Sequence, residues 1–103
     1  TLAQQAQSAQ QTANAEIEFL LGRVEQSGCD FVRNGSAHPP LEAVSHLRRK
    51  LSAVRRGLSA DQFIEHVASK SSMSGNPYWI RCAGKPDEQA APWLRRALQE
   101  RNG

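Results

Sequence analysis

The fold of this chain is decided by two short stretches, CDFVR at residues 29–33 and YWIRC at residues 78–82. Both are rich in aromatic and β-branched side chains, which is typical of β-strands. Turn-forming residues bound them: an Asn-Gly pair at residues 34–35 follows the first, and Pro77 and Gly84 flank the second. The sequence therefore predicts two β-strands that are far apart in the chain.

An antiparallel pairing of the two strands explains most of their residues. It gives three facing pairs: Cys29 with Cys82, Phe31 with Ile80, and Arg33 with Tyr78. Because side chains alternate between two faces, the cysteine, aromatic and aliphatic side chains then share the face that packs on the helices. This shared register favours a disulfide between Cys29 and Cys82, and two neighbouring buried thiols are the alternative. A bridge between cysteines 53 positions apart would add about 4 kcal/mol to the free energy of unfolding.

Four helices are predicted around this sheet. Asn14 is a candidate N-cap for the first, and the two prolines at residues 39–40 suit the start of the second. Ser59 and Gln62 have the spacing of a capping box at the start of the third, and Pro92 fits the first turn of the fourth. We therefore expect an α+β fold, with about four helices and a two-stranded antiparallel sheet (residues 29–33 and 78–82) closed by a disulfide.

The composition indicates one small soluble domain. A chain of 103 residues with 39% hydrophobic and 22% charged residues is ordinary for a single globular unit. Its apolar runs are all shorter than the roughly 20 residues that span a bilayer, so the chain is not expected to span a membrane. Residues 1–13 are rich in Gln and Ala and are predicted to be a flexible or helical N-terminal extension of a single domain at residues 14–103. A start at Thr1 fits a trimmed chain or the removal of a signal peptide.

Basic residues gather in the second predicted helix. The net charge is only +3, from 13 basic and 10 acidic residues, but the stretch between Glu42 and Asp61 contains no acidic residue. That stretch holds His46, Arg48, Arg49, Lys50, Arg55 and Arg56. Such a run is most often a solvated surface, and a binding surface for an acidic protein or an envelope polymer is the second interpretation. Nucleic acid is not expected as a partner, because a disulfide and export argue against it.

The loop at residues 69–77 is the second candidate site. It concentrates four serines, one lysine and a glycine that apolar packing does not explain, and it leads into Tyr78 and Arg81. The members that we expect to contact a ligand are Lys70, Ser71, Ser72, Ser74, Tyr78 and Arg81. The alternative is that the serines cap the preceding helix and order the entry to the strand. A hydrolase with a Ser/Lys/His cluster is a minority hypothesis, because neither Ser-x-x-Lys nor Gly-x-Ser-x-Gly occurs.

The three histidines do not form a metal-binding pattern. His38, His46 and His66 lack the His-x-x-x-His or His-Glu-x-x-His spacing that places two ligands on one helix face. With only two cysteines, a site made of cysteines alone is impossible as well. The sequence therefore predicts no metal and no cofactor.

Three motifs occur in order along the chain: SGCxFxRNG at residues 27–35, HLRxK at residues 46–50 and ASKSSxSGxPYxIRC at residues 68–82. Together they resemble a family of small exported bacterial proteins that is described only as a domain of unknown function. The resemblance covers about residues 16–98. It implies a cleaved signal peptide, a periplasmic location and a paired cysteine, and it carries over no catalytic residue.

The sequence does not reveal an activity. We expect a non-enzymatic periplasmic domain that binds an anionic envelope component or a protein partner, with a small hydrolase as the alternative. The candidate binding residues are His46, Arg48, Arg49, Lys50, Lys70, Ser71, Ser72, Ser74, Tyr78 and Arg81, besides the structural cysteines Cys29 and Cys82.

Overall fold

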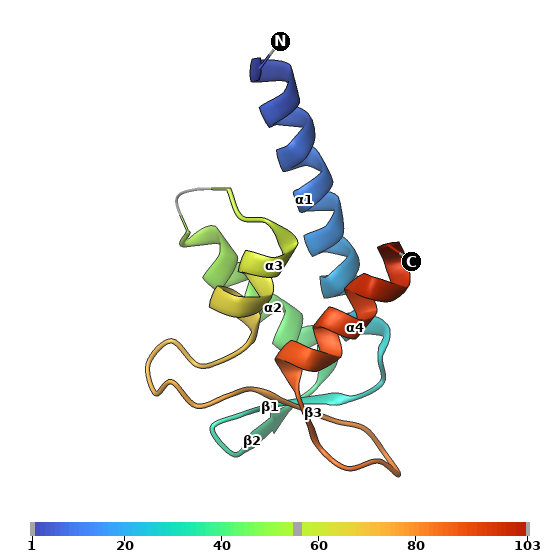
Figure 1. The fold of residues 1–103 in the computed structure, drawn as a ribbon. Helices are drawn as coiled ribbons and strands as arrows, with labels where there is room; N and C mark the ends of the chain where they lie inside the picture. The colour runs from blue at the N-terminus through green and yellow to red at the C-terminus, as the bar shows by residue number, and fades with distance from the viewer. Residues whose placement is uncertain (1, 55–56, 103) are drawn as a thin grey trace.

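The computed structural model describes residues 2–54 and 57–102, and in these ranges it has four helices and one antiparallel sheet (Figure 1). The elements are α1 (Leu2–Gln26), β1 (Asp30–Arg33), β2 (Ser36–His38), α2 (Pro40–Ser52), α3 (Ala60–Phe63), the π-helical turn η1 (Ile64–Ala68), β3 (Trp79–Arg81), β4 (Glu88–Gln89) and α4 (Ala90–Asn102). Figure 1 shows the helices on one side of the sheet, which lies at the bottom of the view. The predicted α+β class is therefore confirmed.

The sheet has four strands in the order β2-β1-β3-β4, so the prediction of two strands was wrong. β1 and β3 do pair antiparallel with Phe31 opposite Ile80, which is the predicted register. β2 was missed because Ser36-Ala37-His38 lacks the β-branched and aromatic residues that mark a strand. It forms because Asn34 and Gly35 both adopt positive φ, 50° and 80°, and return the chain along β1 as a tight hairpin. β4 is two residues long, and its pairing depends on the position of β3.

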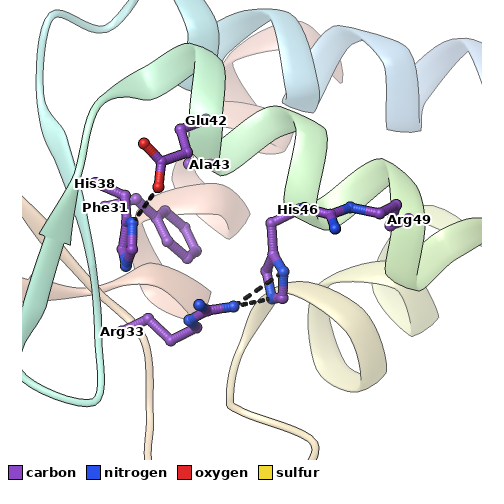
Figure 2. Close-up of a pocket in the computed structure, with 7 residues that line it drawn as sticks. All are labelled: Phe31, Arg33, His38, Glu42, Ala43, His46 and Arg49. Carbon is purple, nitrogen blue, oxygen red and sulfur yellow. Dashed lines mark hydrogen bonds and ion pairs between the residues drawn. The ribbon is translucent and has the colours of Figure 1, made fainter.

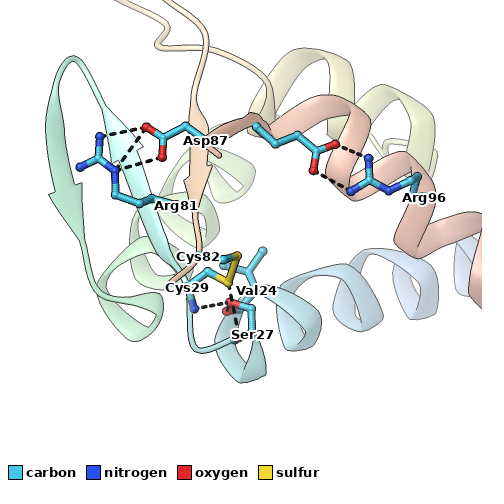
Figure 3. Close-up of a disulfide and its surroundings, with 8 residues drawn as sticks. Val24, Ser27, Cys29, Arg81, Cys82, Asp87 and Arg96 are labelled. Atoms are coloured by element: carbon cyan, nitrogen blue, oxygen red, sulfur yellow. Dashed lines mark hydrogen bonds and ion pairs between the residues drawn. A yellow bond between two sulfur atoms is a disulfide. The ribbon is translucent and has the colours of Figure 1, made fainter. Parts of the chain in front are cut away.

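The predicted bridge is confirmed, because Cys29 and Cys82 form a disulfide with their Cα atoms 4.5 Å apart (Figure 3). The alternative of two free thiols was wrong. Each cysteine lies one residue beyond the paired part of β1 or β3 and packs, partly buried, against the core. The backbone N–H of Cys29 also donates a hydrogen bond of 3.1 Å to Ser27 Oγ, just after α1 ends. The bridge therefore joins the end of α1 and the start of β1 to the end of β3.

The core lies between the helices and the inner face of the sheet. Every helix contributes apolar side chains at helical spacing, as predicted, and the largest buried ones are Leu20, Leu21, Leu47, Phe63, Ile64, Leu94 and Phe31. Burial of each such side chain stabilises the fold by roughly 1.5–3 kcal/mol. Tyr78 belongs to this core too, with only 1% of its surface exposed although it carries a hydroxyl group.

The capping box at the start of α3 is confirmed. Ser59 Oγ accepts a hydrogen bond from the Gln62 backbone N–H, and Gln62 Oε1 accepts one from the Ser59 backbone N–H. Two amides that would lack partners at the helix start are thereby satisfied. The box fixes where the chain turns from the segment after α2 into α3 and η1, which lead to the serine-rich loop.

Two helix boundaries differ from the prediction. α1 is continuous from Leu2, so Asn14 lies inside the helix, where its side chain accepts a hydrogen bond from Gln10 Nε2 at 2.9 Å. The helix crosses the boundary between residues 13 and 14, and the division into extension and domain stays a prediction. α2 ends at Ser52, and the predicted basic residues Arg55 and Arg56 lie outside the described residues. None of the helices described here is long and apolar enough to cross a membrane.

Candidate functional site

Two surface cavities lie beside Arg33, the last residue of β1. Arg33 and His46 line both of them. The first, which we call the His38 cavity, has a volume of about 310 Å³ and also contains His38, Glu42 and Arg49 (Figure 2). The second has a volume of about 290 Å³ and is lined by Arg33, His46, Lys50, Ser71, Ser72 and Tyr78, with Asn34 and Met73 at its edge. We call it the Lys50 cavity. Arg33 and His46 therefore lie between the two neighbouring cavities.

Local structure brings the polar residues of the Lys50 cavity together. Arg33 is the last residue of β1, directly before the tight turn into β2. His46 and Lys50 are four residues apart on α2, so their side chains lie one above the other on the same helix face. Tyr78 precedes β3 and continues the register that sets it opposite Arg33. The end of β1, one face of α2 and the residue before β3 thus come together at the Lys50 cavity.

These side chains contact one another directly. Arg33 Nη1 lies 3.0 Å from both ring nitrogens of His46, as Figure 2 shows. His46 Nε2 is 3.3 Å from the hydroxyl of Tyr78. Lys50 Nζ donates hydrogen bonds to the Tyr78 hydroxyl at 3.1 Å and to the Lys70 carbonyl at 3.0 Å. Because a guanidinium can only donate, its position against the imidazole favours the neutral form of His46.

The pKa values of the cluster are shifted first by burial and second by neighbouring positive charge. Burial lowers the pKa of His46, and the charges of Arg33 and Lys50 lower it further. Burial also lowers the pKa of Lys50, again with a contribution from Arg33. The pKa of Tyr78 is raised, because burial disfavours the phenolate. Burial is the largest cause of each shift, and for His46 and Lys50 nearby positive charge acts in the same direction, so the free site disfavours a further positive charge.

The two cations of the cluster, Arg33 and Lys50, have no carboxylate partner among the described residues. Among the ion pairs of the described residues, none contains Arg33 or Lys50, and no acidic side chain in these ranges lines the Lys50 cavity. In the His38 cavity, Glu42 is present but lies 2.6 Å from His38 Nδ1. Two partly buried cations thus converge with a histidine and a phenol, which is an arrangement suited to an anion.

The structure brings together half of the predicted site residues. His46, Lys50, Ser71, Ser72 and Tyr78 all line the Lys50 cavity. Arg49, one residue before Lys50, instead lines the His38 cavity.

The other predicted residues are engaged elsewhere. Arg48 forms a two-bond ion pair with Glu18, at 2.8 and 2.9 Å. Arg81 pairs in the same way with Asp87 on the outer side of the sheet (Figure 3). Lys70 is exposed and meets the site only through its backbone carbonyl.

Most serines of the loop at residues 69–77 have a structural role. Ser69 Oγ donates to the Glu65 carbonyl at 2.5 Å, and Ser74 Oγ donates to Asn34 Oδ1 at 2.8 Å. Ser71 is nearly buried, and its hydroxyl accepts from the Ser74 backbone N–H at 3.4 Å. Ser69 therefore caps the end of η1, and Ser71 and Ser74 take part in bonds that order the loop, which is the kind of role that the alternative interpretation expected. Among the hydrogen bonds of the described chain, only the Ser72 hydroxyl of this set has no partner, and it borders the cavity.

Sequence reasoning did not select Arg33, Asn34 and Met73 as site residues. The strand register already placed Arg33 opposite Tyr78, and this was the signal that could have found it. Asn34 has a double function, because it forms the β1–β2 turn and its Oδ1 also accepts from the Asn76 amide at 3.2 Å. Met73 has 99% of its surface exposed and gave no sequence signal.

Within residues 2–54 and 57–102, no group of three His, Cys, Asp or Glu side chains is arranged to hold a metal ion. Among the described residues that line the Lys50 cavity, His46 is the one side chain of these types.

Comparison with known proteins connects this chain to a family. A family model described as a family of unknown function (DUF5329) matches residues 11–102, which is most of the chain and includes all residues of both cavities. The chain belongs to this family. The uncharacterized protein YfeK of Salmonella typhimurium (strain LT2) is 50% identical over 66 residues, which cover 62% of this chain and 55% of that protein. The chain thus spans about half the length of this relative. No solved structure matches this chain. Membership of DUF5329 confirms the resemblance noted from the motifs and assigns no activity.

Proposed function

We propose that this protein is an exported binding domain whose Lys50 cavity holds an anionic group of a cell-envelope component. The observation that carries the proposal is the convergence of Arg33 and Lys50 without a carboxylate partner among the described residues. Partial burial of two like charges is unfavourable, and an anion between them adds an attraction to each cation that offsets their repulsion. Elsewhere on the surface, four arginines have carboxylate partners, including Arg48 with Glu18.

The size and chemistry of the cavity favour a compact group. A hollow of about 290 Å³ accommodates one small anionic group, whereas an acidic protein needs a broad contact surface. The donors include a guanidinium, an ammonium and the Ser72 hydroxyl, which together offer charge-assisted hydrogen bonds to oxyanions. The disulfide supports an exported location, because such bonds persist mainly in oxidising compartments.

The hydrolase hypothesis receives less support. Ser71 and Ser72 share the cavity with His46 and Lys50, but among the described hydrogen bonds none joins a serine hydroxyl to either side chain. A serine nucleophile needs such a partner to accept its proton.

The proposal is tested by following backbone amide resonances during a sulfate titration. We expect sulfate to shift the resonances of residues that line the Lys50 cavity, and Arg33→Gln to weaken this response by roughly tenfold or more, as for loss of a charge-assisted bond. Arg48→Gln is the matched control, because this arginine is exposed and already paired with Glu18. Equal binding by both variants would contradict the proposal. Binding of a poly-glutamate peptide across α2 without competition from sulfate would favour an acidic protein partner instead.

A further inference from the structure

His46 stands at the centre of the site and has hydrogen-bond donors and positive charge on several sides. The charged and titratable groups that face it are Arg33 from β1, His38 from β2, Tyr78 from the segment before β3, and Glu42, Arg49 and Lys50 from α2. Glu42 is the one carboxylate among these described groups, and it is bonded to His38. In the free protein, therefore, burial and the neighbouring cations together disfavour a proton on His46.

An anion in the Lys50 cavity changes this balance. Its charge offsets those of Arg33 and Lys50, the two cations that contact or border the imidazole. It also supplies a charged acceptor for an imidazole N–H, whereas the acceptor within reach of His46 Nε2 in the free protein is the neutral Tyr78 hydroxyl at 3.3 Å, which already accepts from Lys50. Both effects favour the imidazolium once the anion is bound.

The number of positive charges indicates the kind of anion. With His46 neutral, Arg33 and Lys50 give the cavity two positive charges, and a protonated His46 gives three. A monoanion such as a carboxylate leaves one of these charges uncompensated when His46 is neutral and two when it is protonated. A tetrahedral dianion, such as a phosphate monoester or the free sulfate ion, offers two charges and at least three oxygens to donors from different elements.

We propose that the Lys50 cavity selects tetrahedral dianions over monoanions and that His46 takes up a proton when the dianion binds. This inference rests on the proposed function, since it describes the ligand and the pH dependence of the same site. By linkage, affinity rises as pH falls between the value at which His46 titrates in the complex and the lower value at which it titrates in the free protein. Below that interval the affinity is constant.

Two probes separate the charge of the ligand from its shape. Sulfate remains a dianion and methanesulfonate a monoanion throughout the range from about pH 5 to 8, so any pH dependence belongs to the protein. The dissociation constant of each is measured from amide shifts at several pH values, and the titration of His46 is followed through its ring carbon resonances with and without sulfate.

We expect sulfate to bind roughly tenfold more tightly than methanesulfonate, and several-fold more tightly at about pH 5.5 than at about pH 7.5. The titration midpoint of His46 should rise when sulfate is present. His46→Gln should abolish the pH dependence and should weaken sulfate binding most at about pH 5.5, where the wild-type protein gains from the proton on His46. His66→Gln, which alters an exposed histidine on η1, should leave the pH dependence unchanged.

The outcomes distinguish this inference from the proposed function. Sulfate binding with an unchanged titration of His46 would overturn the proton uptake, and equal affinity for the two probes would overturn the selection of dianions. In both cases the proposed function stands. If neither probe shifts the resonances of the cavity, the proposed function and this inference are both wrong.

Discussion

Replacement of both bridged cysteines by alanine removes the one covalent link between the start of β1 and the end of β3. The cysteines are 53 positions apart, so their bridge closes more than half of the chain into a loop. On the loop-entropy model, opening a loop of this length lowers the free energy of unfolding by about 4 kcal/mol. Small domains unfold with only about 5–15 kcal/mol in total. The melting temperature of the double variant should therefore fall by roughly 15–30 °C.

The assay is urea unfolding followed by tryptophan fluorescence, because Trp79 and Trp93 are both partly buried and Trp93 lines a cavity together with the two cysteines. Wild-type protein treated with a reductant is the control. If loop closure causes the stabilisation, the reduced protein and the double variant should have similar urea midpoints. A difference of less than about 1 kcal/mol between the oxidised protein and the double variant would refute the reasoning, because the unfolded chain would then gain little freedom from opening the loop.

Three further outcomes follow from local contacts. Ser59→Ala removes the capping box of α3 and should lower the free energy of unfolding by about 1 kcal/mol in urea; an unchanged midpoint would contradict this. Ser71→Ala should lower the melting temperature, whereas Ser72→Ala should leave it unchanged and weaken sulfate binding; the reverse order would contradict the assigned roles. The lowered pKa of folded His46 should make unfolding easier as pH falls below about 6.5, where the unfolded chain binds the extra proton, and His46→Gln should reduce this loss in urea titrations at several pH values.

The central part of the fold could be predicted from the sequence because its determinants are local. The register of β1 and β3 follows from the alternation around Phe31 and Ile80, and the same alternation brought Cys29 and Cys82 together. The capping box at Ser59 is likewise a short-range pattern. In each case, the sequence pattern that predicts the feature is made by the same residues that form it in the structure.

β2 and β4 could not be predicted in this way, because neighbouring elements determine them. Residues 36–38 have weak strand propensity and pair only because Asn34 and Gly35 send the chain back along β1. β4 is a two-residue strand that forms where the chain passes beside β3 on its way to α4. Tertiary context overrides local preference at both places.

The candidate site was predicted in part for a similar reason. Sequence shows which residues are basic, but not which carboxylate lies next to each of them in space. From the sequence, Arg48 and Arg81 are as plausible as Lys50 as anion-binding residues. In the structure they form ion pairs with Glu18 and Asp87. The contact between Glu18 and Arg48 joins α1 to α2 across 30 positions of the chain, a distance over which no local pattern operates.

The most direct test of the central claim is a crystal structure of the protein grown or soaked with selenate, a tetrahedral dianion whose selenium is located by anomalous scattering. The account predicts one strong peak in the Lys50 cavity, with oxygens within hydrogen-bond distance of Arg33 and Lys50, and loss of that peak in Arg33→Gln. Selenate bound only at other basic residues, with the Lys50 cavity empty, would contradict the claim that this cavity is an anion site.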